Sequence, residues 1–331
     1  HRRRHSFPTR RSSDLFGSNF QVARPDTYAG SHNRFEGTIR DSRIGVRIQP
    51  PELSWLRSSA LFELDLFGPT GTIGSTVSEN GFFVSPNLRV RHAYLKMETP
   101  VVDILFGQTW HLFGWQPSYF PAIVQWPGIV GELFSRTTQL RISKTIKTKP
   151  VTIEIAVAGM RPPERDSSFP EFEAGLRLSF NKWTAVHTGY LTSTGTQAAS
   201  IGVSGDLRMF TLPEFAAMPQ SANSKLGLGI AVNAFLPIIP RTKDRKDNSL
   251  AILGEFVTGQ GINDLYTGLT GGVANPALPG TPAPTYASGV DAGLAVYDIN
   301  GQLQLPRWTT FVVSVEYYLP RVGGRDRKSV V

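Results

Sequence analysis

The sequence is poor in residues that often serve as nucleophiles and metal ligands. It has no cysteine, so it has no thiol nucleophile, and outside the first fifteen residues it has only the histidines His32, His92, His111 and His187. It contains neither an HExxH zinc motif nor a GxSxG nucleophile elbow. We therefore expect no enzyme activity, no cofactor and no bound metal.

Long apolar runs are also absent. No stretch approaches the roughly 18 consecutive apolar residues that a transmembrane helix needs. The longest apolar segments are interrupted by a polar or charged residue at about every second position. The sequence thus excludes a helical membrane protein, whereas a strand crosses a membrane with only about 9–11 residues and turns its polar side chains to the other face.

The two ends of the sequence differ in character from its body. Residues 1–15 and 326–331 look like translated sequencing-adapter read-through, and such scars are excluded from fold reasoning. They contribute +4 and +1, so the formal net charge of +8 falls to +3 for residues 16–325. We therefore expect one domain over 16–325, truncated at both ends, and no nucleic-acid partner, because most of the basic charge lies outside the fold.

Apolar and polar residues alternate through nearly the whole body. The segments 43–49, 151–157 and 172–180 each place apolar side chains on one face and ions, Gly or Ser on the other. A period of two predicts β-strands. Alternation alone does not separate a membrane barrel from a soluble sandwich, because both have one apolar and one polar face.

Three further features favour the membrane barrel. The pattern gives about fourteen strands, which a closed barrel accommodates without exposed edges. Short connections, such as those at 98–101, 145–150, 181–182 and 305–307, contrast with long ones at 68–86, 111–135 and 259–290, as in outer-membrane barrels. Aromatic residues mark strand ends, as expected of interfacial girdles: Tyr94, Trp110, Trp183, Tyr190, Trp308, Tyr317 and Tyr318. The predicted fold is an all-β transmembrane antiparallel β-barrel with about sixteen strands when complete and about fourteen here.

Five segments in series resemble the DcaP-like trimeric porins of Gram-negative outer membranes. They are RDSRIGVRI (40–48), ALFELDLFG (60–68), LRVRHAYLKM (88–97), ILFGQTW (104–110) and RTTQLRIS (136–143). The resemblance implies a homotrimer of sixteen-stranded barrels in the outer membrane whose lumen favours small anions such as carboxylates. The family's N-terminal coiled-coil segment, first strand and closing strand are not recognisable in this sequence, as expected if the open reading frame is truncated at both ends.

The polar phase of the strands supplies the candidate pore lining. Facing this phase inward places seven arginines and at least two acids in the lumen: Arg43, Arg47, Arg89, Arg91, Arg141, Arg177, Arg208, Asp65 and Glu173, with Glu154, Glu255 and Glu316 in the same phase. An excess of arginine lowers the barrier for anions. The alternative is that these residues form structural cross-strand ion pairs.

The connection from His111 to Phe134 is unusually aromatic for an extracellular loop. It carries Trp115, Tyr119, Phe120, Trp126 and Phe134 together with three prolines. So much apolar area would be unfavourable in water. We predict that this loop folds into the barrel as a constriction, and the alternative is a contact or latch between subunits.

These observations predict an outer-membrane porin, a passive channel for small hydrophilic solutes that favours anions. Its expected partners are membrane lipid and lipopolysaccharide, small anionic solutes and two further copies of the chain. Two other classes stay open: an outer-membrane barrel hydrolase of lipids or esters with a spatially assembled site, and a soluble carbohydrate-binding β-sandwich.

Overall fold

A computed structural model describes twelve ranges of the chain. They are residues 31, 39–40, 42–68, 72–73, 76–77, 87–121, 131–162, 167–189, 194–241, 248–266, 294–298 and 300–320. The chain divides into two compact units, residues 1–48 with 60–93, and residues 49–59 with 94–331. No helix in the described ranges is long and apolar enough to cross a membrane.

The first unit contains the N-terminal strands. β1 (Arg43–Ile48) pairs with β2 (Arg57–Asp65) in an antiparallel register that sets Arg43 opposite Asp65. β2 lies between β1 and β5 (Arg89–Glu98), and β5 ends in the second unit. Two short strands, β3 (Thr72–Ile73) and β4 (Thr76–Val77), form a separate hairpin.

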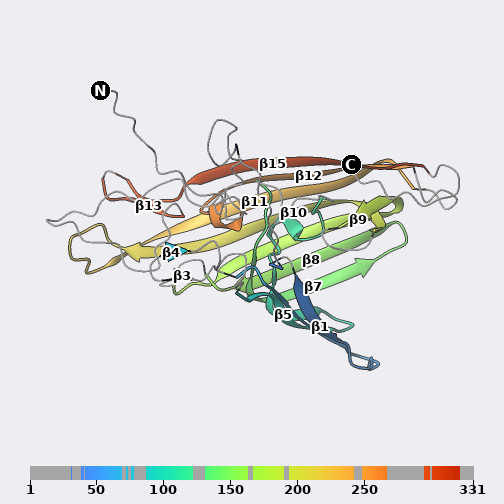
Figure 1. Cartoon of the computed structure of the whole chain (residues 1–331), viewed down its shortest axis with the longest axis horizontal. Coiled ribbons are helices and arrows are strands. Elements are labelled where there is room, and N and C mark those ends of the chain that lie inside the picture. Colours follow the sequence, from blue (N-terminus) through green and yellow to red (C-terminus); the bar gives the residue numbers. More distant parts are fainter. Residues whose placement is uncertain are drawn as a thin grey trace. The chain divides into compact units, whose positions relative to one another are not determined.

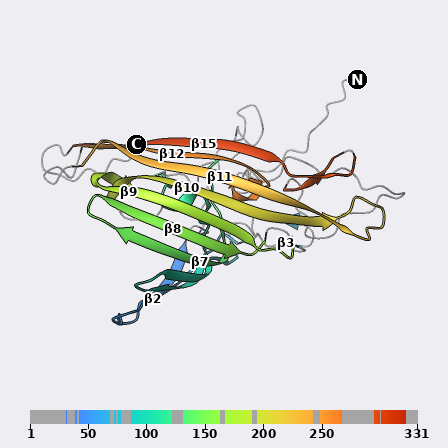
Figure 2. The same cartoon turned by 180° about the vertical axis from the view of Figure 1, so that it is seen from behind.

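The second unit is built on long antiparallel strands that are neighbours in chain order. They are β6 (Asp103–Trp110), β7 (Arg136–Lys147), β8 (Val151–Met160), β9 (Glu171–Thr188), β10 (Thr194–Pro213), β11 (Ala222–Ile239), β12 (Ser249–Gln260) and β15 (Arg307–Tyr318). Figures 1 and 2 show β7 to β12 and β15 side by side from opposite directions. Within the described residues β15 pairs with β12 on one side only, so the sheet has an open edge there. The hairpin of β13 (Val296–Tyr297) and β14 (Leu303–Gln304) precedes β15.

The two faces of these strands are buried in the reverse of the soluble pattern. In β9, Glu171 and Glu173 are 1% and 2% exposed, whereas the intervening Phe172 is 43% exposed. In β10, Ser204 is buried and its neighbour Val203 is exposed. We call the face of each strand that carries the polar phase the inner face and the opposite face the outer face. A soluble sandwich would bury the apolar phase, so the structure excludes the sandwich and confirms the all-β, membrane-type fold.

One predicted turn is wrong. We expected a tight connection at Asn181–Lys182, but β9 runs through it as one strand of 18 residues. The register with β10 shifts there, because Ala198 faces Thr184 and Ala199 faces Phe180, which leaves residues 181–183 as a bulge. Asn181 instead serves the neighbouring β7–β8 turn: its side-chain amide donates to the Thr148 carbonyl at 2.9 Å, and its backbone N–H donates to the Pro150 carbonyl. Asn181 therefore stabilises the turn between β7 and β8 and does not form a turn of its own.

The aromatic strand ends divide into two groups. Trp183 and Tyr317 are 41% and 36% exposed, as a girdle requires. Trp110 is 8% exposed and packs edge-on against Phe120 and Phe134, with ring centroids 5.1 and 4.8 Å away. Trp110 therefore belongs to the packing of the loop that follows β6, and Tyr190 lies outside the described residues.

Candidate functional site

The loop after β6 lies against the inner face of β10. The backbone N–H of Gly114 donates to Ser204 Oγ at 2.8 Å, and Trp115 Nε1 donates to the Val203 carbonyl at 3.2 Å. Further along, the Tyr119 hydroxyl donates to Ser200 Oγ at 3.1 Å. These contacts join residues about 80 to 90 positions apart in the sequence. The described parts of the loop, 111–121 and 131–135, are thus bound to the wall of the sheet.

Glycines on the inner face make this close approach possible. A Cβ on Gly175 would lie 2.9 Å from Trp115 Cζ2, and a Cβ on Gly202 would lie 2.7 Å from Trp115 Cδ1. Phe113 packs in the same way on Gly229, where an added Cβ would lie 2.8 Å from Phe113 Cζ. The short helix Phe113–Trp115 and its two aromatic side chains therefore occupy space that only glycine leaves open.

Two buried carboxylates hold the ends of the loop. Glu173 Oε2 accepts hydrogen bonds from the backbone N–H groups of Leu112 at 2.6 Å and Phe113 at 2.9 Å. At the other end, Glu255 Oε1 accepts from the backbone N–H of Leu133 at 3.0 Å, and its Oε2 accepts from Asn233 Nδ2 at 2.9 Å. Each carboxylate thus joins a backbone N–H group of the loop to a strand, and both ends of the loop are fixed to the sheet.

A second loop segment packs beside the first. The backbone N–H of Phe134 donates to the Leu265 carbonyl at 2.9 Å, and Leu133 forms a β-bridge with Tyr266. The Tyr266 ring stacks on Trp308 and its hydroxyl accepts from Thr310 Oγ1 at 3.0 Å. Burial raises the pKa of the Tyr266 phenol above its ordinary value, so it stays neutral. Residues 261–266 thereby extend the covered part of the inner face.

Four of the five predicted loop aromatics lie in the described residues. Trp115, Tyr119 and Phe120 are buried, and Phe120 stacks on Phe134 with ring centroids 5.4 Å apart. Trp126 lies outside the described residues. The contacts place this loop against the sheet, and its role as a constriction stays a prediction.

In the first unit three predicted lining residues, Arg89, Arg91 and Asp65, form one ion-pair group with Glu63. Arg89 Nη2 lies 2.6 Å from Asp65 Oδ2, and Arg91 bridges Glu63 at 2.7 Å and Asp65 at 3.0 Å. Arg91 is 1% exposed, and the pairing that the sequence left as an alternative holds for both arginines. Arg47 differs from them because its side chain is exposed. It lies on the same strand face as Gly45, the residue opposite Glu63.

In the second unit the three predicted arginines also have polar partners. Arg177 pairs with Glu154 across the β8–β9 register, and Arg141 donates to the Trp110 carbonyl at 2.6 Å. Arg208 is buried and meets Glu171 at 3.1 Å and Asp264 at 2.6 Å. Whether any of these residues filters ions is untested; Arg177 with Glu154 and Arg208 with Glu171 have the geometry of cross-strand pairs, and Arg141 does not.

The two units carry opposite charge on the inner faces of their described strands. In the first unit four arginines (Arg43, Arg47, Arg89 and Arg91) face two acids (Glu63 and Asp65). In β6 to β15 of the second unit seven acids share the inner face with five basic residues: Asp103, Glu154, Glu171, Glu173, Asp206, Glu255 and Glu316 with Arg141, Lys147, Arg177, Arg208 and Lys225. The sequence analysis did not single out Glu171 and Asp206, although each falls in the polar phase of its strand. The expected arginine excess therefore belongs to the first unit alone.

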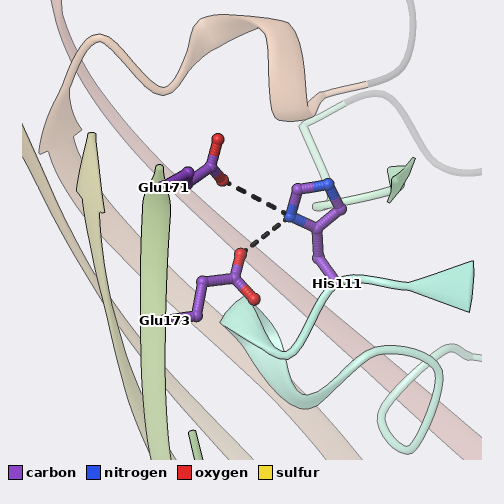
Figure 3. A group of neighbouring side chains, drawn as sticks. All are labelled: His111, Glu171 and Glu173. Atoms are coloured by element: carbon purple, nitrogen blue, oxygen red, sulfur yellow. Dashed lines mark hydrogen bonds and ion pairs between the residues drawn. The ribbon is translucent and has the colours of Figure 1, made fainter. Parts of the chain in front are cut away.

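One group of side chains has the composition of a metal site. Figure 3 shows Glu171 and Glu173 of β9 pointing toward the ring of His111, the first residue after β6. His111 Nδ1 lies 2.7 Å from Glu173 Oε1 and 3.7 Å from Glu171 Oε1. No sequence pattern indicated this group, because the histidine and the acids are about 60 positions apart and follow no ligand spacing.

Comparison with solved structures identifies the fold. The chain resembles the outer membrane channel DcaP of Acinetobacter baumannii with a TM-score of 0.53 and 14% sequence identity, covering 88% of this chain and 65% of that chain. A loop-deletion mutant of OmpT, an outer membrane protein of Vibrio cholerae, gives a TM-score of 0.28 and 13% identity over 66% of this chain and 74% of that one. No protein-family model matches the sequence, and no curated protein does.

The first of these likenesses carries an argument about fold, and the second is too weak to do so. At 14% identity the fold alone is shown, and this chain spans about two thirds of the length of the DcaP structure. The resemblance to DcaP-like porins that five sequence segments indicated is confirmed at this level. The chain has the fold of an outer-membrane β-barrel.

Proposed function

We propose that this chain, with its outer-membrane barrel fold, forms a passive channel of a bacterial outer membrane that admits small hydrophilic solutes. The observation that carries the proposal is the reversed burial of the strands, with ions and small polar groups on the inner face and large apolar side chains on the outer face. Such an outer face suits lipid, and such an inner face suits a hydrated lumen. The similarity to a solved outer-membrane channel supports it.

A preference for small anions such as carboxylates is the finer part of the proposal. It rests on the first unit, where arginines outnumber acids on the inner face of β1, β2 and β5. Charged rings in a low-dielectric pore raise the local concentration of counter-ions. Arg47 is the strongest candidate for contact with solutes, because it is exposed whereas Arg91 is buried between two carboxylates.

The loop from 111 to 134 is proposed to narrow this channel. Its hydrogen bonds to Ser204, Ser200 and Glu255 run across the inner faces of β10 and β12, where an inserted loop would reduce the open cross-section. A homotrimer in contact with membrane lipid and lipopolysaccharide completes the proposal, in line with the resemblance to trimeric porins.

The test is the zero-current potential across a planar bilayer under a salt gradient, with the full-length protein reconstituted from detergent. Stepwise conductance with anion preference supports the channel and its arginine filter together. Conductance with cation preference keeps the channel and rejects the filter. A folded, inserted barrel without any conductance step would contradict the proposal of a channel and would favour the alternative of a barrel enzyme.

A further inference from the structure

We propose that His111, Glu171 and Glu173 bind one divalent transition-metal ion of the Zn²⁺ type on the inner face of β9. The three side chains are almost wholly buried, with at most 4% of any of them exposed. Their ligand atoms, His111 Nδ1 and one carboxylate oxygen from each Glu, lie within 4.8 Å of one another. Figure 3 shows both carboxylates directed at the same ring nitrogen.

Unsatisfied oxygens at this place point to a cation as the ligand. Among the described residues, Glu171 Oε1, the atom turned toward His111, accepts no hydrogen bond, and neither do the two oxygens of Asp206. Asp206 faces Glu173 directly in the β9–β10 register and is 3% exposed. A buried polar atom without a partner costs about 1–3 kcal/mol, and more when it is charged. A cation held by His111 and Glu173 would satisfy the Glu171 oxygen, and the adjacent Asp206 carboxylate adds negative potential.

The local charge agrees with a dication. Four carboxylates gather here, those of Glu171, Glu173, Asp206 and Asp264, and Arg208 lies within 3.7 Å of three of them. Arg141 is the second guanidinium of this group and attracts the Glu173 carboxylate. When all four carboxylates are ionised and His111 is the neutral ligand, two guanidinium groups leave a charge of −2. Such a charge is costly to bury, and one divalent ion would balance it.

The donor set selects the class of metal. One imidazole nitrogen with two carboxylates suits Zn²⁺ and similar ions, whereas Ca²⁺ takes six to eight oxygens. Glu173 is oriented as a ligand, because the N–H groups of Leu112 and Phe113 hold its Oε2, and a metal would replace the hydrogen bond between its Oε1 and His111 Nδ1. Tetrahedral zinc ligands lie about 3.4 Å apart. The separations of 2.7 and 3.7 Å from His111 Nδ1 need changes of less than about 1 Å, and that between the two carboxylate oxygens, which is at most 4.8 Å, needs a change of no more than about 1.4 Å.

Such an ion would join the start of the loop to the sheet. His111 is the residue at which the chain leaves β6, and Glu171 and Glu173 belong to β9. The metal would thus fasten the loop at the end where Glu173 already receives two backbone hydrogen bonds. This inference stands on side-chain geometry and does not depend on whether the barrel conducts.

The test uses the full-length protein, refolded in detergent and dialysed against a chelator, and titrated with ZnCl₂ in a calorimeter. The expected result is one Zn²⁺ per chain and a raised unfolding temperature. The Glu171→Gln variant keeps the shape and an acceptor for Arg208, and its zinc affinity is expected to fall by about tenfold or more. Cobalt substitution should give the absorption bands of a four-coordinate site in the wild type and not in Glu171→Gln.

His187→Ala is the matched control. His187 is also a buried inner-face histidine, with Nδ1 at 3.0 Å from Glu316, but within the described residues no second carboxylate converges on it to complete a group of three ligands. Its removal should leave the zinc stoichiometry unchanged. A folded wild type that binds no Zn²⁺, equal affinity in the wild type and Glu171→Gln, or stoichiometric binding of Ca²⁺ in preference to Zn²⁺ would each overturn the proposal.

Discussion

Individual glycines decide how closely the loop approaches the sheet. Gly202 and Gly205 lie three positions apart in β10, but only Gly202 is on the inner face. A Cβ on Gly202 would lie 2.7 Å from Trp115 Cδ1 and 3.2 Å from the Tyr119 hydroxyl. Among the described residues, a Cβ on Gly205 would meet only the Gly229 carbonyl oxygen, at 3.7 Å. The two positions therefore differ in what an added methyl group touches.

We expect Gly202→Ala to lower the free energy of unfolding by about 1–3 kcal/mol, because the methyl group forces Trp115 and its loop away from the sheet. Gly205→Ala should be neutral or stabilising by about 0.5–1 kcal/mol, since Ala loses less backbone entropy than Gly. Urea unfolding of the refolded protein, followed by tryptophan fluorescence, measures both. Equal effects of the two substitutions would show that Trp115 does not pack on Gly202 as described.

Among the elements, the strands were predictable and the loop contacts were not. A period of two fixes the face of every residue once one is known, so the inward positions of Glu173 and Arg208 followed from the sequence. The partners did not, because Glu173 binds residues about 60 positions away in a loop of irregular backbone. The bulge at 181–183 was hidden for a related reason: Asn181 bonds to Thr148 in another hairpin. Local pattern carries no information about such long-range contacts.

The position of the loop depends on Glu255 at its C-terminal end as well as on Glu173 at its start. Glu255→Ala leaves the Leu133 N–H and Asn233 Nδ2 without their acceptors, which costs about 1–3 kcal/mol. We expect faster cleavage within residues 111–134 by limited proteolysis, read by mass spectrometry, because this end of the loop is released. Glu255→Gln keeps an acceptor for Leu133 and should restore most of the resistance. Unchanged cleavage in the Ala variant would mean that other contacts hold the loop.

At the scale of the whole molecule, charge is distributed unevenly between the two units. The inner face of the first unit is basic, and that of the second is acidic in its described strands, where two of the acids, Glu173 and Glu255, hold the loop. An anion filter is therefore expected from the first unit. Reversing Arg91 would set a third carboxylate against Glu63 and Asp65, and we expect that variant to misfold. Arg47 is exposed and allows the charge to be changed with less damage.

Arg47→Glu is expected to move the zero-current potential of the reconstituted channel toward cation preference, and Arg47→Gln should move it about half as far, because the pore field follows the charge. Lys149→Glu makes the same change of charge in the exposed β7–β8 turn and serves as the matched control. The shift should shrink between about 0.1 M and 1 M salt, since the Debye length falls from about 10 Å to about 3 Å. If Arg47→Glu gives no shift, or Lys149→Glu gives an equal one, selectivity does not arise at the arginines of β1.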